Sequence, residues 1–171
     1  MRTKLSSTNH FSKTYLGKLR TKIGTDLVLS PGARILIFNQ RNELLLQLRS
    51  DFKVWGLPGG SPEVEESIFE CIQREVLEET GLNLLNAQAC AFSSKPEIET
   101  IIYPNNDKVQ GFSLIFFASA NDWNGSLKTD IDESLDLKFF PMTQLPEIYK
   151  LDQYSLKLFS DFQKTNQFQV G

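Results

Sequence analysis

One short stretch concentrates negative charge on a single predicted helix. Between Gly59 and Leu82 the chain reads GGSPEVEESIFECIQREVLEETGL, with seven glutamates and one arginine, Arg74. Its apolar residues recur at three- and four-residue spacings, which predicts an amphipathic helix from Ser67 to Thr80, capped by Gly81. The residues expected on its buried face are Ile68, Phe69, Ile72, Val76 and Leu77, with Cys71 on the outer side. The rest of the chain must therefore pack around a strongly acidic helix.

Three glutamates fall on one edge of this helix. Glu75, Glu78 and Glu79 are spaced to share one side, next to the apolar face. Like charges at these spacings cost roughly 0.2–0.5 kcal/mol per pair, and carboxylates at a helix C-terminus oppose the helix dipole. A bound divalent cation would turn this repulsion between carboxylates into attraction, and carboxylate oxygens suit Mg²⁺ or Mn²⁺. The alternative is an ordinary solvated face, which is what we expect for the remaining glutamates, Glu63, Glu65 and Glu70.

The remaining chain alternates short apolar runs with turns. Residues 33–39 and 43–50 flank the polar turn NQRN and are predicted to form a β-hairpin, and further strands are expected at 82–93, 109–120 and 135–141. Helices are expected at 11–23 and 151–162. Strands with helices inserted between them indicate an α+β or mixed α/β fold. The length fits one domain, 1–171, with an N-terminal helical arm (1–25) and a C-terminal helix and tail (151–171).

Composition excludes several classes of function. A net charge of -3 and a pI near 5.3 disfavour a nucleic-acid partner, so phosphate must be held by local chemistry. Two cysteines, Cys71 and Cys90, make no disulfide framework, and one histidine, His10, makes histidine-based catalysis or metal binding improbable. There is no apolar run long enough for a signal peptide or a membrane span. We expect a reduced, cytoplasmic protein that does not enter a membrane.

The spacing within the acidic stretch matches a known pattern. It reads Gly60, five residues, Glu66, seven residues, Arg74-Glu75-Val76, one residue, Glu78-Glu79, one residue, Gly81-Leu82. At every defined position this resembles the signature of the Nudix hydrolases, and the resemblance extends from about Pro31 to Pro146. Many members carry glycine just before the first signature glutamate. This chain has Glu65 there, and we expect at most a changed loop conformation.

The resemblance implies a fold and a chemistry. The family fold is an α/β/α sandwich around a mixed β-sheet, and the signature forms a loop–helix–loop. Its members hydrolyse a nucleoside diphosphate linked to another moiety, by attack of water on phosphorus. By resemblance, Glu75, Glu78 and Glu79 would ligate Mg²⁺ or Mn²⁺. The residues with structural or orienting roles would be Arg74, by pairing with a glutamate, and Glu66 and Gly81, while Gly59 and Gly60 would let the loop backbone approach metal and phosphates.

The general base remains open between several carboxylates. One carboxylate can stay outside the metal's coordination shell and accept the proton of the attacking water. Glu75 and Glu79 are candidates, and Glu133, just before the strand at 135–141, is a third that can equally be a turn residue. Arg49 ends a strand near the signature and is a candidate phosphate contact, with a surface ion pair as the alternative. Trp55 is expected to anchor the core ahead of the glycine loop.

The substrate is expected to be a small nucleotide. Pro96 lies near the place, about 15 residues past the signature, where ADP-ribose-cleaving members often carry a proline. The chain resembles small bacterial members of this kind, which favours ADP-ribose or another nucleoside diphosphate sugar. Two alternatives are a nucleoside triphosphate pyrophosphohydrolase and a nucleotide-sensing Nudix domain without catalysis. An RNA-end pyrophosphohydrolase is disfavoured by the acidic pI. Relatives are commonly dimers, and the N-terminal arm offers a surface for a homodimer.

Overall fold

The computed structural model describes residues 12–129 and 134–171. The strands are β1 (Leu27–Ile37), β2 (Glu43–Arg49), β3 (Trp55–Gly56), β4 (Gly59–Gly60), β5 (Leu82–Leu84), β6 (Gln88–Ser93), β7 (Thr100–Ile102), β8 (Lys108–Ala118), β9 (Trp123–Gly125), β10 (Ser134–Pro141) and β11 (Gln169–Val170). The helices are α2 (Tyr15–Ile23), α3 (Ile68–Thr80), α4 (Pro96–Glu99) and α5 (Lys150–Thr165).

The strands of the described residues form two larger sheets and a small one. The first has the order β11-β6-β8-β1-β4, with β7 also paired to β8. The second has the order β10-β2-β3, and β5 pairs with β9. β1 runs parallel to β8 and antiparallel to β4, so the first sheet is mixed, as expected.

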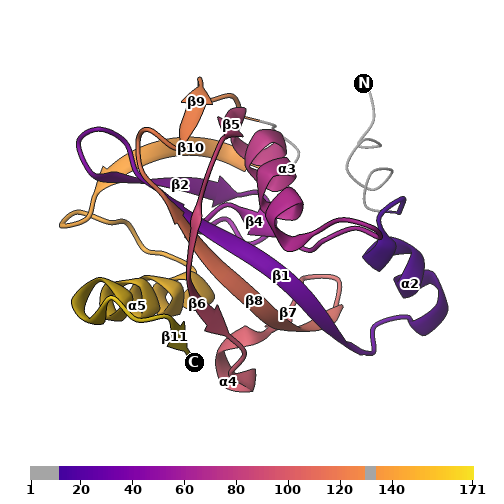
Figure 1. Cartoon of the computed structure of the whole chain (residues 1–171). Helices are drawn as coiled ribbons and strands as arrows, with labels where there is room; N and C mark the ends of the chain where they lie inside the picture. Colours follow the sequence, from indigo (N-terminus) through magenta and orange to yellow (C-terminus); the bar gives the residue numbers. More distant parts are fainter. Residues whose placement is uncertain (1–11, 130–133) are drawn as a thin grey trace.

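Helices α3 and α5 lie on opposite sides of the strands (Figure 1). Because side chains alternate along a strand, Ile35 and Ile37 of β1 pack with α3, and Leu36 packs with α5. The same alternation in β2 directs Leu45 to the α3 side and Leu44 to the α5 side. Strands buried on both faces read as continuous apolar runs. The result is the α/β/α sandwich that the resemblance implied.

Helix α3 begins and ends where the sequence predicts, but it is rotated relative to the prediction. Ser67 and Glu70 form a reciprocal capping box at its start, so Glu70 is not merely solvated surface. Gly81 ends the helix with φ 74°. Leu77 is 55% exposed and Cys71 is fully buried, which contradicts the predicted positions of both. The rotation instead buries Glu79, whose backbone carbonyl accepts a hydrogen bond from Ser134 of β10.

The predicted hairpin between residues 33–39 and 43–50 is wrong beyond its turn. The two strands meet at one isolated bridge, between Phe38 and Leu44, and then separate into different sheets. β1 continues between β8 and β4, and β2 continues between β10 and β3. Local alternation cannot show this, because the partners of each strand lie far away in the sequence. The predicted strand at 82–93 likewise divides into β5 and β6, which belong to different sheets.

The other predicted elements are present. β8, β10 and α5 coincide closely with the predicted segments, and α2 lies within the predicted helix at 11–23 but begins only at Tyr15. Trp55 packs edge-on against Phe140 at 4.9 Å between ring centroids and borders the core on the α5 side, as expected. No helix within residues 12–129 and 134–171 is long and apolar enough to cross a membrane.

The loop before α3 contains a strained position. Glu65 has φ 70°, in the left-handed region that costs a residue with a Cβ about 1 kcal/mol or more. Glycine enters this region freely, and glycine is the residue that the resemblance leads one to expect here. The loop at Glu65 thus has a backbone conformation that suits glycine.

We predict that Glu65→Gly raises the unfolding free energy by about 0.5–1 kcal/mol, because relief of the strain exceeds the added entropy of the unfolded chain. The matched control is Val64→Gly, at the neighbouring exposed position, which lacks a positive φ. This control should lower stability by a similar amount. Urea denaturation of the three proteins measures both effects, and equal losses in both variants would contradict the strain at Glu65.

Candidate functional site

Two glycines bring the loop backbone against β1 and α3. A Cβ on Gly59 would overlap the carbonyl of Ala33, and a Cβ on Gly60 would overlap the carboxyl group of Glu75. Gly59 and Ala33 belong to the short ladder in which β4 pairs with β1. These close approaches place the loop beside the carboxylates of α3, which explains why two glycines stand at this point.

Arg74 organises the acidic edge of α3. Its Nε and Nη2 donate to the two carboxylate oxygens of Glu66 at 2.8 and 3.0 Å, and Nη2 also donates to the carbonyl of Ser61 at 3.1 Å. Its Nη1 donates to Glu75 at 2.8 Å and to Glu78 at 3.0 Å. The fork with Glu66 lowers the pKa of that carboxyl group. Arg74 therefore fixes the loop and two glutamates of the helix together.

Glu79 is a buried carboxyl group, with 8% of the residue exposed. It accepts a hydrogen bond from the backbone N–H of Gly59 at 2.8 Å, and Gln47 also hydrogen-bonds to it. Burial, together with the negative charge of Glu75 nearby, raises the pKa of Glu79 to about 8. Glu79 is thus a desolvated acidic group beside the carboxylate of Glu75, which itself pairs with Arg74.

Glu75 and Glu79 face a cavity of about 380 Å³. The other lining residues come from α2, from the end of β2, from the turn between β7 and β8, and from β8: Leu16, Arg20, Gln47, Arg49, Ser50, Asp51, Tyr103, Asn105, Asp107 and Val109. A cavity of this size can hold a small molecule.

A smaller cavity of about 100 Å³ borders the first, and both are lined by Arg49, Tyr103 and Val109. Arg34 of β1 donates to both carboxylate oxygens of Glu99, at 3.1 and 2.7 Å, and its Nε lies 3.8 Å from Asp152. Burial raises the pKa of Asp152 to about 6, although the positive charges of Arg34 and Arg49 act to lower it. This second cavity is walled by a buried charged group of three side chains.

The donor set near Glu75 and Glu79 fits a hard divalent cation by its chemistry. Carboxylate and carbonyl oxygens are what Mg²⁺ and Mn²⁺ prefer, and the buried carboxyl group of Glu79, whose pKa is raised, gains from added positive charge. The side-chain positions do not form a closed coordination set: within the described residues no three acidic, cysteine or histidine side chains stand in a metal-binding group. Glu75 and Glu78 both accept a hydrogen bond from Nη1 of Arg74, and Glu78 does not line the cavity that Glu75 and Glu79 face.

Several predicted residues have other surroundings than expected. Arg49 lines both cavities and forms a two-pronged ion pair with Asp51, at 3.0 and 2.6 Å, and its contact with a substrate phosphate stays a prediction. Burial alone would lower the pKa of Arg49, but the pair with Asp51 raises it. Pro96 begins α4 and does not line either cavity described here. Glu133 and His10 lie outside the described residues.

Sequence reasoning missed the polar residues that the strands contribute. Arg34 and Gln47 interrupt apolar runs in β1 and β2, and a polar residue in a buried run was an available signal. Glu99 and Asp152 reach the same region from distant segments, and their local sequence gives no indication of it. Cys71 is buried, and burial raises the pKa of its thiol to about 12, which keeps it protonated.

Comparison with known proteins assigns the family. The NUDIX domain model matches residues 28–162, so this chain belongs to the NUDIX family and is a hydrolase of nucleotide derivatives. It is 31% identical over 115 residues to a candidate 8-oxo-dGTP diphosphatase from Bacillus subtilis (strain 168), over 67% of this chain and 68% of the relative.

Two further relatives show the range of the family. An NAD-capped RNA hydrolase from Vibrio atlanticus is 29% identical over 116 residues, which is 67% of this chain but only 38% of that longer protein. The crystal structure of an ADP-ribose pyrophosphatase from Streptococcus suis superposes with a TM-score of 0.59 at 20% identity, over 83% of this chain and 98% of the other. The last likeness concerns the fold alone.

The raised pKa of Asp152 predicts a pH-dependent stability. The folded-state value of about 6 lies above the ordinary 3.8, so the ionised form weakens folding as pH rises from about 4 to 6. Asp152→Asn removes this penalty and can still accept the hydrogen bond from Leu57 N–H. The unfolding free energy of the variant relative to wild type should therefore rise by roughly 1–3 kcal/mol between pH 4 and pH 7.

Urea denaturation at several pH values measures this difference. Asp161→Asn is the matched control, because Asp161 lies on the same helix but is only half-buried, and Lys157 lowers its pKa. The unfolding free energy of Asp161→Asn relative to wild type should fall as the pH rises through the acidic range. A pH-independent difference for Asp152→Asn would show that this carboxyl group is not buried in its charged form.

Proposed function

We propose that this protein hydrolyses the diphosphate of a nucleoside diphosphate linked to another moiety, with ADP-ribose or a nucleoside diphosphate sugar as the favoured substrate. The supporting observation is that Glu75 and Glu79, two acidic groups of the signature helix, line one substrate-sized cavity. This is the place where a diphosphate and its cations would have to meet.

In this proposal Glu75, Glu78 and Glu79 hold Mg²⁺ or Mn²⁺, which when bound neutralises the diphosphate and lowers the pKa of water. Glu78 would have to exchange its bond with Arg74 for the cation. Arg74 can release it without losing its own position, because Glu66 and the carbonyl of Ser61 still hold the guanidinium group. Arg74 thus acts as a positioning residue and does not contact the substrate.

The proton of the attacking water goes to a carboxylate, and we propose Glu75 or Glu79 for this role. Gly59 N–H fixes one oxygen of Glu79, and the side chain is desolvated, so its orientation is set before substrate arrives. Glu133 remains a further candidate whose surroundings lie outside the described residues. Arg49, at the border of both cavities, is our proposed contact for a substrate phosphate.

A nucleoside triphosphate pyrophosphohydrolase is the second candidate. The relationship to the Bacillus subtilis protein favours this reading, because that relative is described as acting on 8-oxo-dGTP. The lining of the larger cavity favours the first candidate: Asp107, which lies 3.7 Å from Arg20 Nε without a hydrogen bond to it, would repel a further phosphate.

A substrate panel with Mg²⁺ distinguishes these candidate functions. We expect the highest kcat/KM with ADP-ribose or a nucleoside diphosphate sugar, and a preference for 8-oxo-dGTP or another triphosphate would support the second candidate. A protein that cleaves no member of the panel, but whose melting temperature one member raises, would be a nucleotide sensor and would contradict the proposed hydrolysis.

Replacement of Glu79 tests the proposed metal site. Glu79→Gln should lower kcat by roughly 100-fold or more, because the variant loses a charged ligand or the base. Without metal its stability should be unchanged or higher, since at neutral pH folding of the wild type must either bury the charge of Glu79 or bind a proton there, and both weaken folding. Glu70→Gln on the same helix is the control and should keep full activity, because glutamine also serves in a capping box. Undiminished kcat in Glu79→Gln would refute the assignment.

A further inference from the structure

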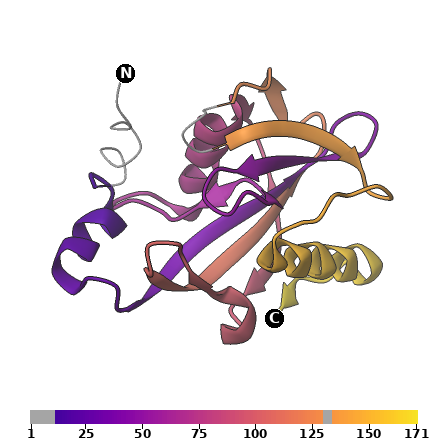
Figure 2. The ribbon, with the colours of Figure 1, turned by 180° about the vertical axis from the view of Figure 1, so that it is seen from behind.

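Helix α2 lies outside the matched NUDIX region, residues 28–162, yet it forms part of the catalytic cavity. Leu16 and Arg20, one helical turn apart, line the same cavity as Glu75 and Glu79. Figures 1 and 2 show α2 beyond the loop that precedes α3 and beside the turn between β7 and β8. The helix therefore closes the cavity on the side away from the signature helix.

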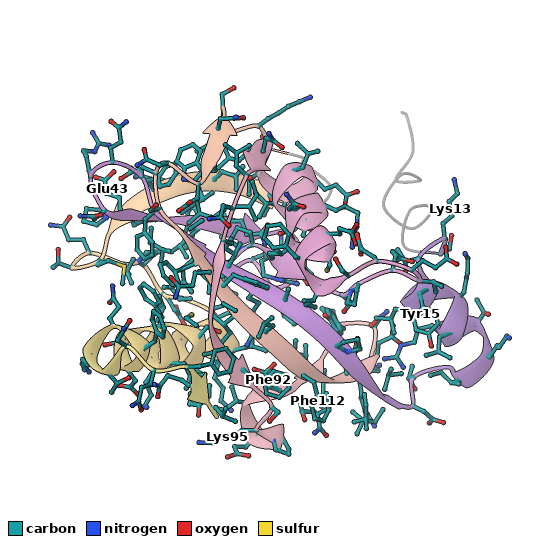
Figure 3. All side chains as sticks on the ribbon, in the orientation of Figure 1. Lys13, Tyr15, Glu43, Phe92, Lys95 and Phe112 are labelled. Carbon is teal, nitrogen blue, oxygen red and sulfur yellow. The ribbon has the colours of Figure 1, made fainter. Side chains whose placement is uncertain are left out.

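Polar contacts hold α2 in this place. The guanidinium group of Arg20 donates to the carbonyls of Gly24 and Asp26 at 3.1 and 2.5 Å, and to that of Lys108, at the start of β8, at 2.6 Å. At the other end, the backbone N–H of Tyr15, marked in Figure 3, donates to Glu63 of the signature loop at 2.8 Å. Glu63, predicted to be solvated surface, is thus a tether for this wall.

The chemistry of the wall fits a hydroxyl group. Nε of Arg20 is buried without a hydrogen-bond acceptor among the described residues, and it lies 3.7 Å from the carboxylate of Asp107. That distance is too long for a hydrogen bond but leaves a donor and an acceptor close together. A hydroxyl group both accepts and donates, so it can satisfy the two at once. A phosphate only accepts, and the carboxylate would repel it.

The neighbouring residues support the same class of ligand. Asn105 donates to Asp107 at 3.0 Å and lines the cavity with Tyr103, so amide and phenol groups border the carboxylate. Leu16 and Val109 add apolar surface that can cover the C–H face of a sugar ring.

We propose that α2 and the turn between β7 and β8 form the binding wall for the uncharged, hydroxyl-bearing group on the far side of the substrate's diphosphate, a ribose or hexose. This rests on the proposed hydrolysis of a nucleoside diphosphate derivative. Leu16 and Asp107 contact that group, and Arg20 is a positioning residue that also offers Nε–H to a hydroxyl.

The first test compares two tryptophan substitutions on adjacent positions of α2. Leu16→Trp fills the cavity and should raise KM for ADP-ribose about tenfold or more, with a smaller change in kcat, because the glutamates of α3 are untouched. Tyr15→Trp places the same side chain at an exposed position and should behave as wild type. Equal KM values for the two variants would overturn the assignment of α2 to the substrate site.

The second test asks what the wall recognises. Asp107→Asn should lower kcat/KM for ADP-ribose about tenfold, the effect expected for a lost hydrogen bond to a charged group, and should leave that for dATP unchanged or higher. Equal losses with both nucleotides would overturn recognition of the sugar, because they would mean that Asp107 only supports the fold.

Failure of the proposed binding wall can be distinguished from failure of the proposed hydrolysis. If the wild type cleaves no nucleotide in the panel, calorimetric titration of wild type, Leu16→Trp and Tyr15→Trp with ADP-ribose decides the matter. Binding weakened about tenfold in Leu16→Trp alone supports the wall without turnover. Equal affinities in all three proteins, or no binding to the wild type, overturn it.

Discussion

The burial of the Glu79 carboxyl group is the constraint on which the site depends. Desolvating a carboxylate is costly, and here a hydrogen bond from Gly59 N–H and one from Gln47 offset only part of that cost, because Glu75 adds negative charge. A helix free to minimise its energy would turn Leu77 inward in its place. The observed rotation of α3 therefore lowers the stability of the fold and places an acidic group at the cavity, as is typical of functional sites.

The sequence predicted this helix well because its signals are local. The cap at Ser67, the stop at Gly81 and the apolar spacing all lie within the helix or next to it. The rotation was not predictable in the same way, because a helical wheel centres the buried face on apolar residues and here Glu79 and Thr80 are buried as well. Strand pairing is non-local, which is why the predicted hairpin was wrong beyond its turn, and the α/β/α layers were anticipated only from the family resemblance. The charged group around Arg34 is completed by two remote segments of the chain, so the sequence could not predict it.

The acidic stretch is less uniform than its composition suggests. Arg74 binds Glu66, Glu75 and Glu78 in one network, so a single cation positions three of the seven glutamates. Glu70 caps the helix and Glu63 accepts a hydrogen bond from Tyr15 N–H, which leaves the buried Glu79 and the exposed, strained Glu65. Like charges are therefore tolerated because most of these glutamates have a hydrogen-bonding partner, and the buried acidic group among them, Glu79, lines the cavity.

The acidic residues at the cavity imply that phosphate and cation must bind together. Arg49 is paired with Asp51, and two nitrogens of Arg20 already donate to carbonyls, so a phosphate that contacts Arg49 does so beside a negative charge. Asp51, Asp107, Glu75 and Glu79 outnumber these arginines in the lining of the cavity. An anionic substrate gains from this environment only when divalent cations change its sign. Under the proposed function, metal affinity and substrate affinity are then coupled, and the acidic cavity itself excludes metal-free nucleotides.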